Sequence, residues 1–224
     1  MNQSIGRRPN YFILSLVLLF PLNVFSEQEW HAQTGMLEPY RGEPPQVELD
    51  EKERDRLEKG GTVFKNLSHG DIKRGVIVFR VAAPAAVVWS VIKDFNSYPE
   101  WIDGVDKAGI YKEENGHTYV HFEGHNFFLG KLTWYVNHAY PEDDRNWGTW
   151  TLDYNHVSDF EDSVGFWRVQ PVRDDPGSSD VIYSADIKFN IRIPSFIERI
   201  VVKMQIKKAT HWVRKQAEAR TDVQ

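Results

Sequence analysis

The sequence predicts an α+β fold in which a curved antiparallel sheet of six to seven strands wraps around a long C-terminal helix. Segments that alternate between apolar and polar residues are separated by turn sequences, which is the pattern of a strand meander. One face of these strands is apolar and aromatic over its whole width. The last segment, residues 195–219, contains no proline or glycine and is long enough to cover that face as a helix.

The N-terminus has the pattern of an export signal. Arg7 and Arg8 precede an apolar run over residues 11–20, and Val24-Phe25-Ser26 suits signal peptidase. We expect residues 1–26 to be a secretory signal peptide and the protein to be periplasmic or secreted. An uncleaved anchor is the alternative, although the run is short for a membrane span, which needs roughly 20 apolar residues. The chain contains no cysteine, so disulfides and thiolate chemistry are excluded.

Residues 27–60 are expected to form an N-terminal linker and a short charged helix. The first part is polar and interrupted by Gly35, Pro39, Gly42, Pro44 and Pro45. The charged stretch over residues 50–59 reads as a helix ended by two glycines at 60 and 61. We place one ligand-binding domain at residues 61–219 and a tail at residues 220–224.

The domain opens with a strand followed by short helices. Residues 73–81 alternate and are rich in β-branched side chains, which predicts a strand. Pro84 fits the first position of a helix, because its missing N–H is not needed there. Val88, Ile92 and Phe95 give that helix an apolar stripe, and Pro99 ends it.

Six further strands are expected, at residues 105–112, 118–123, 127–139, 147–154, 164–172 and 180–190, joined by short turns. Side chains two residues apart share a face of a strand, so the alternation sorts them into two sets. The set assigned to the inner face is Leu132, Trp134, Val136, Trp150, Leu152, Tyr154, Trp167, Val169, Val181, Tyr183, Ala185, Ile187 and Phe189.

The predicted C-terminal helix begins with a capping-box sequence, Ser195 to Glu198, behind Pro194. On a helical wheel its apolar face carries Ile197, Ile200, Val201, Met204 and Trp212. A basic stripe contains Arg199, Lys203, Lys207 and Arg214. This stripe is our candidate for peripheral contact with anionic lipid head groups, and a solvated face is the alternative.

One stretch carries a family resemblance. Ala83-Pro84, Val88-Trp89, Asp94 and Pro99-Glu100-Trp101 match an alanine-proline start, a Val-Trp pair, an aspartate and a proline-aromatic turn. This segment resembles the opening of the START-like (helix-grip, SRPBCC) superfamily, in particular its polyketide cyclase/dehydrase and coenzyme Q-binding branch. The resemblance extends from about residue 60 to about residue 219. It implies the same sheet around a long helix and an internal cavity for lipids, quinones or polyketide-like aromatics.

The large aromatic side chains of the inner face are the candidate lining of that cavity, and we select Trp101, Trp134, Trp150, Trp167, Tyr183 and Met204. An apolar ligand would bind there by the area-proportional hydrophobic effect. The alternative is that these residues pack only with one another and leave no space.

Three other residue sets carry side chains that could form a site. His117, His121, Glu123 and His125 share a strand face and carry zinc-type ligands, but alternate residues on a strand lie too far apart for one ion. The acidic stretch with Asp153, His156, Asp159, Glu161 and Asp162 lacks the spacing of a calcium loop and reads as a solvated turn. His138, Tyr154, His156 and Tyr183 have suitable chemistry for acid–base catalysis but stand in no diagnostic motif. We therefore assign no catalytic residue, metal or cofactor.

The sequence thus predicts a protein that binds or carries a hydrophobic small molecule, such as a lipid, a fatty acid or a quinone-like compound. A cyclase or dehydratase acting on an apolar substrate is one alternative, and a packed interaction module without ligand is the other. The net charge of −5 argues against nucleic acid as a partner, since that binding needs a basic surface.

Overall fold

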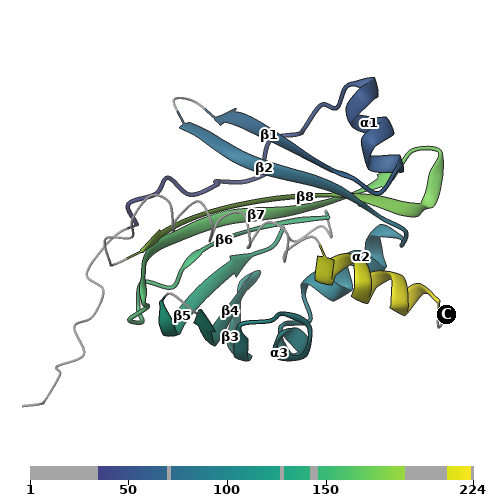
Figure 1. Ribbon diagram of the computed structural model, residues 1–224. Coiled ribbons are helices and arrows are strands. Elements are labelled where there is room, and N and C mark those ends of the chain that lie inside the picture. Colours follow the sequence, from purple (N-terminus) through teal and green to yellow (C-terminus); the bar gives the residue numbers. More distant parts are fainter. Residues whose placement is uncertain (1–34, 70–71, 127–128, 142–145, 190–210, 223–224) are drawn as a thin grey trace, which may run out of the picture.

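The computed structural model describes residues 35–69, 72–126, 129–141, 146–189 and 211–222. Within them the chain forms one eight-stranded antiparallel sheet with the order β1-β2-β8-β7-β6-β5-β4-β3 (Figure 1). The strands are β1 Thr62–His69, β2 Ile72–Val81, β3 Val105–Glu114, β4 His117–Asn126, β5 Gly130–Ala139, β6 Trp147–Leu152, β7 Phe160–Val172 and β8 Asp175–Phe189. The helices are α1 Glu51–Glu58, α2 Ala85–Ile92, the 3₁₀ turn η1 Phe95–Ser97 and α3 Tyr98–Trp101, and residues 211–221 are also helical.

This architecture confirms the predicted α+β fold with a C-terminal helix against an antiparallel sheet, although the strand count is higher than expected. The additional strand is β1, which pairs with β2 from Thr62 to His69. It lies at the edge of the sheet and has a single neighbouring strand. Its sequence does not alternate cleanly between apolar and polar residues, because Phe64, next to the buried Val63, is apolar and yet 60 % exposed.

The sheet buries apolar side chains on both faces. The inner face carries the main core, in which Phe79, Val81, Val169 and Val181 pack against helical residues from α2, α3 and the C-terminal helix. The outer face carries a second, smaller core of Tyr40, Leu57, Val63, Val76, Val78, Phe166 and Ile182. Figure 1 shows α2, α3 and the C-terminal helix on one side of the sheet and α1 on the other.

The inner helices follow the predicted apolar stripe but not the predicted boundaries: α2 ends at Ile92, and Pro99, predicted to end the helix, lies in the first turn of α3. Pro84 is the N-cap of α2, and Val88, Val91 and Ile92 are buried against the sheet. Phe95 and Tyr98 continue this core through η1 and α3, and the Tyr98 hydroxyl donates to the carbonyl of Ile92 at 2.6 Å. Burial raises the pKa of the Tyr98 phenol well above its usual value.

The outer core is covered by α1 and by residues 35–49, here called the N-terminal strap. Asp50 caps α1 in a capping box with Glu53, and Leu57 anchors the helix in the outer core. In the strap, the Tyr40 ring packs edge-on against Phe166 at 4.8 Å between centroids. The strap therefore lies against the sheet along the described part of the predicted linker.

Buried polar side chains fasten the strap to the outer face. Arg168 donates to the carbonyl of Pro44 at 2.6 Å and to the carboxylate of Glu43 at 2.8 Å. Asp162, which is fully buried, accepts from the backbone N–H of Leu37 and from the hydroxyl of Tyr154, both at 2.6 Å. Asp162 belongs to the acidic stretch, and its carboxylate therefore holds the strap and the turn that contains Tyr154.

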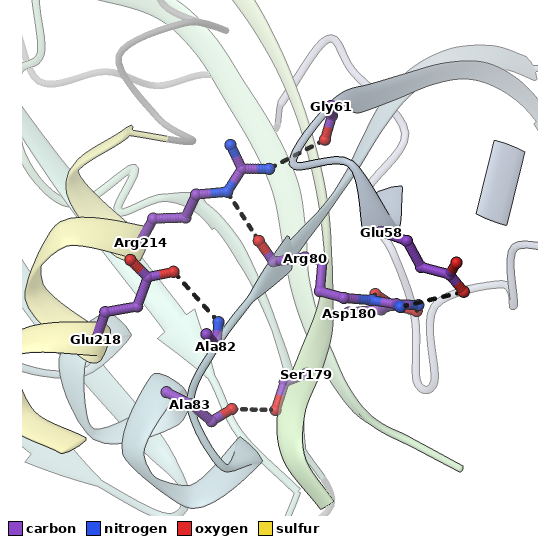
Figure 2. Close-up of polar contacts among 9 residues, drawn as sticks. All are labelled: Glu58, Gly61, Arg80, Ala82, Ala83, Ser179, Asp180, Arg214 and Glu218. Atoms are coloured by element: carbon purple, nitrogen blue, oxygen red, sulfur yellow. Dashed lines mark hydrogen bonds and ion pairs between the residues drawn. The ribbon is translucent and has the colours of Figure 1, made fainter. Parts of the chain in front are cut away.

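The described part of the C-terminal helix, residues 211–221, is attached to β2 and its neighbouring residues by hydrogen bonds (Figure 2). Arg214 donates from Nε to the carbonyl of Arg80 at 2.8 Å and from Nη2 to the carbonyl of Gly61 at 3.0 Å. Glu218 accepts from the N–H of Ala82 at 3.2 Å. Beyond the helix, Ser179 of β8 donates to the carbonyl of Ala83 at 2.8 Å, so the start of α2 is tied to the sheet as well.

Arg214 thus differs from its predicted place in an exposed basic stripe. Its guanidinium is half-buried, lies 5.6 Å from the centroid of Phe79, and has a pKa lowered from its ordinary value by that burial. The other members of the stripe, Arg199, Lys203 and Lys207, lie outside the described residues, so the membrane-contact hypothesis stays a prediction for them. Among the residues that the structure describes, no helix is both long and apolar enough to cross a membrane.

Candidate ligand-binding site

A cavity of about 250 Å³ lies between the inner face of the sheet and the inner helices. Strands β4 to β8 supply most of its wall, and Tyr98 and Trp212 close it from the helical side. Residues 102–105, before and at the start of β3, also line it, together with His125 and Asn126 at the end of β4 and Leu129 before β5. Rings dominate its wall: Tyr98, Phe122, Trp134, His138, Trp150, Phe160, Trp167, Tyr183, Phe189 and Trp212.

The structure brings four of the six predicted lining residues together around this cavity: Trp134, Trp150, Trp167 and Tyr183. Tyr183 stacks on Trp150 at 5.7 Å and lies 4.2 Å from Trp167 between ring centroids. The fifth, Trp101, belongs to the core but not to the cavity wall, because it stacks on Trp212 at 6.2 Å and is covered by Arg220. The sixth, Met204, lies outside the described residues.

Two glycines allow the tryptophan rings to lie flat on the sheet. A Cβ at Gly165 would lie 2.1 Å from Cζ2 of Trp150 and 2.3 Å from the carbonyl of Ser184. A Cβ at Gly124 would lie 2.3 Å from the carbonyl of Gly104 and 3.1 Å from Cη2 of Trp134. The contacts with the two carbonyls and with Trp150 are too close for a methyl group, so the backbone at these positions accommodates the cavity wall.

His138 was missed as a lining residue, although it shares the parity of Trp134 and Val136 on β5. It pairs across the sheet with Trp150, and its ring lies 4.6 Å from Phe95 between centroids. Its Nε2 atom is buried and has no hydrogen-bond partner within the described residues. Burial lowers the pKa of His138 to about 3, so the imidazole is neutral at physiological pH.

The remaining polar groups of the wall are few. The Tyr183 phenol has a pKa raised above its usual value by burial, and Ser163 faces the cavity from β7. Asp103 and His125 also line the cavity, and His125 pairs with Asp106 at 2.8 Å. Among the described residues that line the cavity there is no lysine or arginine.

The predicted inner position of Tyr154 is wrong. Strand β6 ends at Leu152, and Tyr154 lies in the following turn with its hydroxyl on Asp162. His156 lies in the same turn and stacks on Tyr135 at 4.4 Å, on the outer side of the sheet. Of the four residues weighed for acid–base chemistry, the cavity therefore contains His138 and Tyr183.

The histidines of β4 are engaged separately. His117 contacts Asn137 at 2.8 Å, His121 stacks on Tyr135 at 4.6 Å, and Glu123 pairs with Lys107 at 3.0 Å. Over the described ranges, no three histidine or carboxylate side chains gather in a way that could hold a metal ion.

The acidic stretch likewise supplies acceptors to its surroundings. Asp159 accepts from the N–H of Thr133 at 2.6 Å. Asp153 accepts from the Tyr111 hydroxyl at 2.6 Å. Burial by itself raises the pKa of Asp153, and hydrogen bonds from Tyr111 and Asn155 outweigh it, so the net shift is downward.

An antiparallel sheet closed on one side by helices, with an aromatic cavity between the layers, defines the chain as a helix-grip protein. Residues 81–211 match the family model described as polyketide cyclase / dehydrase and lipid transport. Because this match covers more than half of the chain, the protein belongs to that family, and the predicted START-like resemblance is confirmed.

Solved structures of the same fold include the Zhui aromatase/cyclase from Streptomyces sp. R1128, at 17 % identity and a TM-score of 0.55, covering 71 % of this chain and 96 % of that one. A STAR-related lipid transfer protein from Xanthomonas axonopodis matches at 17 % identity and a TM-score of 0.55, covering 70 % and 92 %. A START superfamily protein from Mycobacterium smegmatis matches at 16 % identity and a TM-score of 0.54, covering 64 % of this chain and 96 % of that one. At these identities the likeness shows the fold alone. No curated protein matches the chain.

Proposed function

We propose that this protein binds a hydrophobic small molecule in the cavity between the sheet and the inner helices, and acts as its carrier or sensor. The observation that carries the proposal is the cavity of about 250 Å³ with a mostly aromatic wall. The membership of a family that includes lipid transport supports it. Each 100 Å² of apolar ligand surface that leaves water there contributes about 2.5 kcal/mol.

Binding without chemistry is favoured over a cyclase or dehydratase activity by the state of His138. A general acid or base works best with a pKa near the operating pH. The pKa of His138 is lowered to about 3, so at neutral pH it is the uncharged imidazole, which is a weak acid and a weak base. The cavity residue with a carboxylate is Asp103, which is exposed at one end of the cavity, among the described residues.

The place of action that we propose is the periplasm or the exterior of the cell. It is supported by Arg7 and Arg8 before the apolar run of residues 11–20. N-terminal sequencing of the protein isolated from the periplasmic fraction, with a start near residue 27, is the expected result. Recovery of the whole protein in the cytoplasm with residue 1 intact would refute this part of the proposal.

Ligand binding is tested by titration with N-phenyl-1-naphthylamine, whose fluorescence rises in apolar sites, and by native mass spectrometry of the gently purified protein. Ala185 lines the cavity, so Ala185→Phe fills it with the protein's own atoms. Lys131 is exposed on β5, and Lys131→Phe adds the same ring outside as a matched control. We expect saturable binding in the wild type and in Lys131→Phe, and its loss in Ala185→Phe. Equal binding by all three proteins, or by none, would refute the proposal.

A further inference from the structure

The imidazole of His138 is a polar group that the packing of the protein leaves unsatisfied. It is 8 % exposed, lies on the wall of the cavity and has a buried Nε2 with no partner among the described residues. Buried polar groups are hydrogen-bonded in the great majority of native structures, and of the described residues with an unsatisfied buried nitrogen only His138 lines the cavity, where a ligand can supply the partner.

The surroundings of His138 define the chemistry of that partner. The rings of Phe95, Trp150 and Tyr140 lie 4.6, 6.1 and 6.3 Å from the imidazole between centroids and supply no charge. The ammonium of Lys93 lies over the Tyr140 ring at 4.6 Å, but Lys93 is not part of the cavity wall. Among the described residues that line the cavity there is no lysine or arginine, so a ligand carboxylate buried there would gain no cation from them, which is unfavourable.

A neutral imidazole provides one donor and one acceptor, so it can bond to a hydroxyl or a carbonyl oxygen. The torsion about the Cβ–Cγ bond of a histidine has broad wells, which allows the ring to turn a nitrogen toward a ligand. The rings of the wall favour a flat partner, because aromatic pairs gain from offset stacking beyond the area they bury. The size of the cavity, at the lower limit of ligand pockets, favours a compact partner.

We propose that the cavity selects a compact, planar ring compound through one uncharged oxygen, a phenolic hydroxyl or a quinone-type carbonyl, which hydrogen-bonds to the imidazole of His138. This inference rests on the proposed function and adds the ligand class. It excludes fatty carboxylates as the preferred ligand of the described cavity. His138 is then a specificity-determining residue.

The test compares 2-naphthol with 2-methylnaphthalene, which has nearly the same shape and no oxygen, by equilibrium dialysis at pH 7. The quantity measured is the ratio of their two dissociation constants, in the wild type and in variants. His138→Leu removes both nitrogens, whereas His138→Gln keeps a donor near the position of Nε2. His156→Leu removes a histidine from the outer side of the sheet and is the matched control.

We expect His138→Leu to shift the ratio about tenfold toward 2-methylnaphthalene, since one hydrogen bond to a buried group is lost. His138→Gln and His156→Leu should stay within about twofold of the wild type, because both retain a hydrogen-bonding group at position 138. An unchanged ratio in His138→Leu, or an equal shift in His156→Leu, would overturn the inference.

A second measurement needs no variant. The wild type should bind 2-naphthoate, an anion of similar shape, at least about tenfold more weakly than 2-naphthol, because the carboxylate loses its water without gaining a cation. Equal or tighter binding of 2-naphthoate would overturn the selection of an uncharged oxygen. If neither naphthol nor methylnaphthalene binds, the proposed function itself fails; if both bind without discrimination, only this inference fails.

Discussion

Replacing His138 with leucine should make the protein more resistant to acid unfolding. In the folded state, burial holds the pKa of His138 at about 3, against an ordinary value of 6.5. Above pH 6.5 the side chain is neutral in both states and no proton uptake separates them. Below pH 6.5 the unfolded chain binds a proton that the folded chain cannot, so folding stability falls as the pH falls toward 3.

The magnitude follows from the two pKa values. Each pH unit between 6.5 and 3 costs about 1.4 kcal/mol of unfolding free energy, so the loss between pH 7 and pH 4.5 is about 2.5 kcal/mol. Leucine does not titrate and leaves no unpaired polar atom, which adds about 1 kcal/mol of stability at pH 7 as well. The stability advantage of His138→Leu should therefore grow by about 2.5 kcal/mol between these two pH values.

Urea unfolding followed by tryptophan fluorescence measures this advantage at pH 7 and at pH 4.5. Carboxylates that titrate in the same range are common to both proteins and cancel in the comparison. The control is His156→Leu, whose histidine has a 42 % exposed side chain and lies outside the cavity. A His138→Leu advantage that is the same at both pH values would refute the reasoning, because His138 would then titrate as freely in the folded state as in the unfolded one.

Three further substitutions, each measured by urea unfolding, test the cavity wall, the outer core and the attachment of the C-terminal helix. Gly165→Ala should cost about 3 kcal/mol, because its methyl group meets the Trp150 ring and a backbone carbonyl; a cost below about 0.5 kcal/mol would show that the ring does not lie on the sheet. Tyr40→Ala should cost about 3 kcal/mol by emptying the contact with Phe166, and should expose the strap to proteolysis; unchanged stability and protease resistance would contradict its role. Arg214→Leu should cost about 2 kcal/mol by leaving two backbone carbonyls without their donor; a neutral effect would show that the far end of the helix is held by its apolar side chains alone.

The inner face could be predicted from sequence because strand parity is a local property. Trp134, Trp150, Trp167 and Tyr183 were placed on one face by alternation alone, and they meet at the cavity. Where the strand boundary was wrong the parity rule failed, as for Tyr154, which follows the end of β6 and turns to Asp162. Strand parity predicts on which face of the sheet a side chain lies, but only as long as the residue is still part of the strand.

The outer face could not be predicted in the same way. Phe166 and Ile182 alternate with the inner residues, but they are buried only because the strap and α1 cover them. This cover depends on contacts such as Arg168 with Pro44, which join residues 124 positions apart. A segment rich in proline and glycine carries no periodic signal that would reveal such a contact.

The special position of His138 also depends on long-range packing. Its parity on β5 indicates an inward side chain, but the absence of a partner follows from the rings that surround it, which come from η1, from β6 and from Tyr140 directly after β5. Sequence alone therefore identifies it as one of several titratable residues. The structure distinguishes it by burial and by its unsatisfied nitrogen.

The central claim is that the rings of the sheet enclose a space that accepts a ligand, and crystals soaked with 6-bromo-2-naphthol test it most directly. Anomalous scattering from bromine should place the compound in the cavity, with its rings against Trp150 and Tyr183 and its oxygen within hydrogen-bonding distance of His138. Crystals that diffract well after soaking, with no bromine peak between the sheet and the inner helices at saturating concentration, would contradict the account.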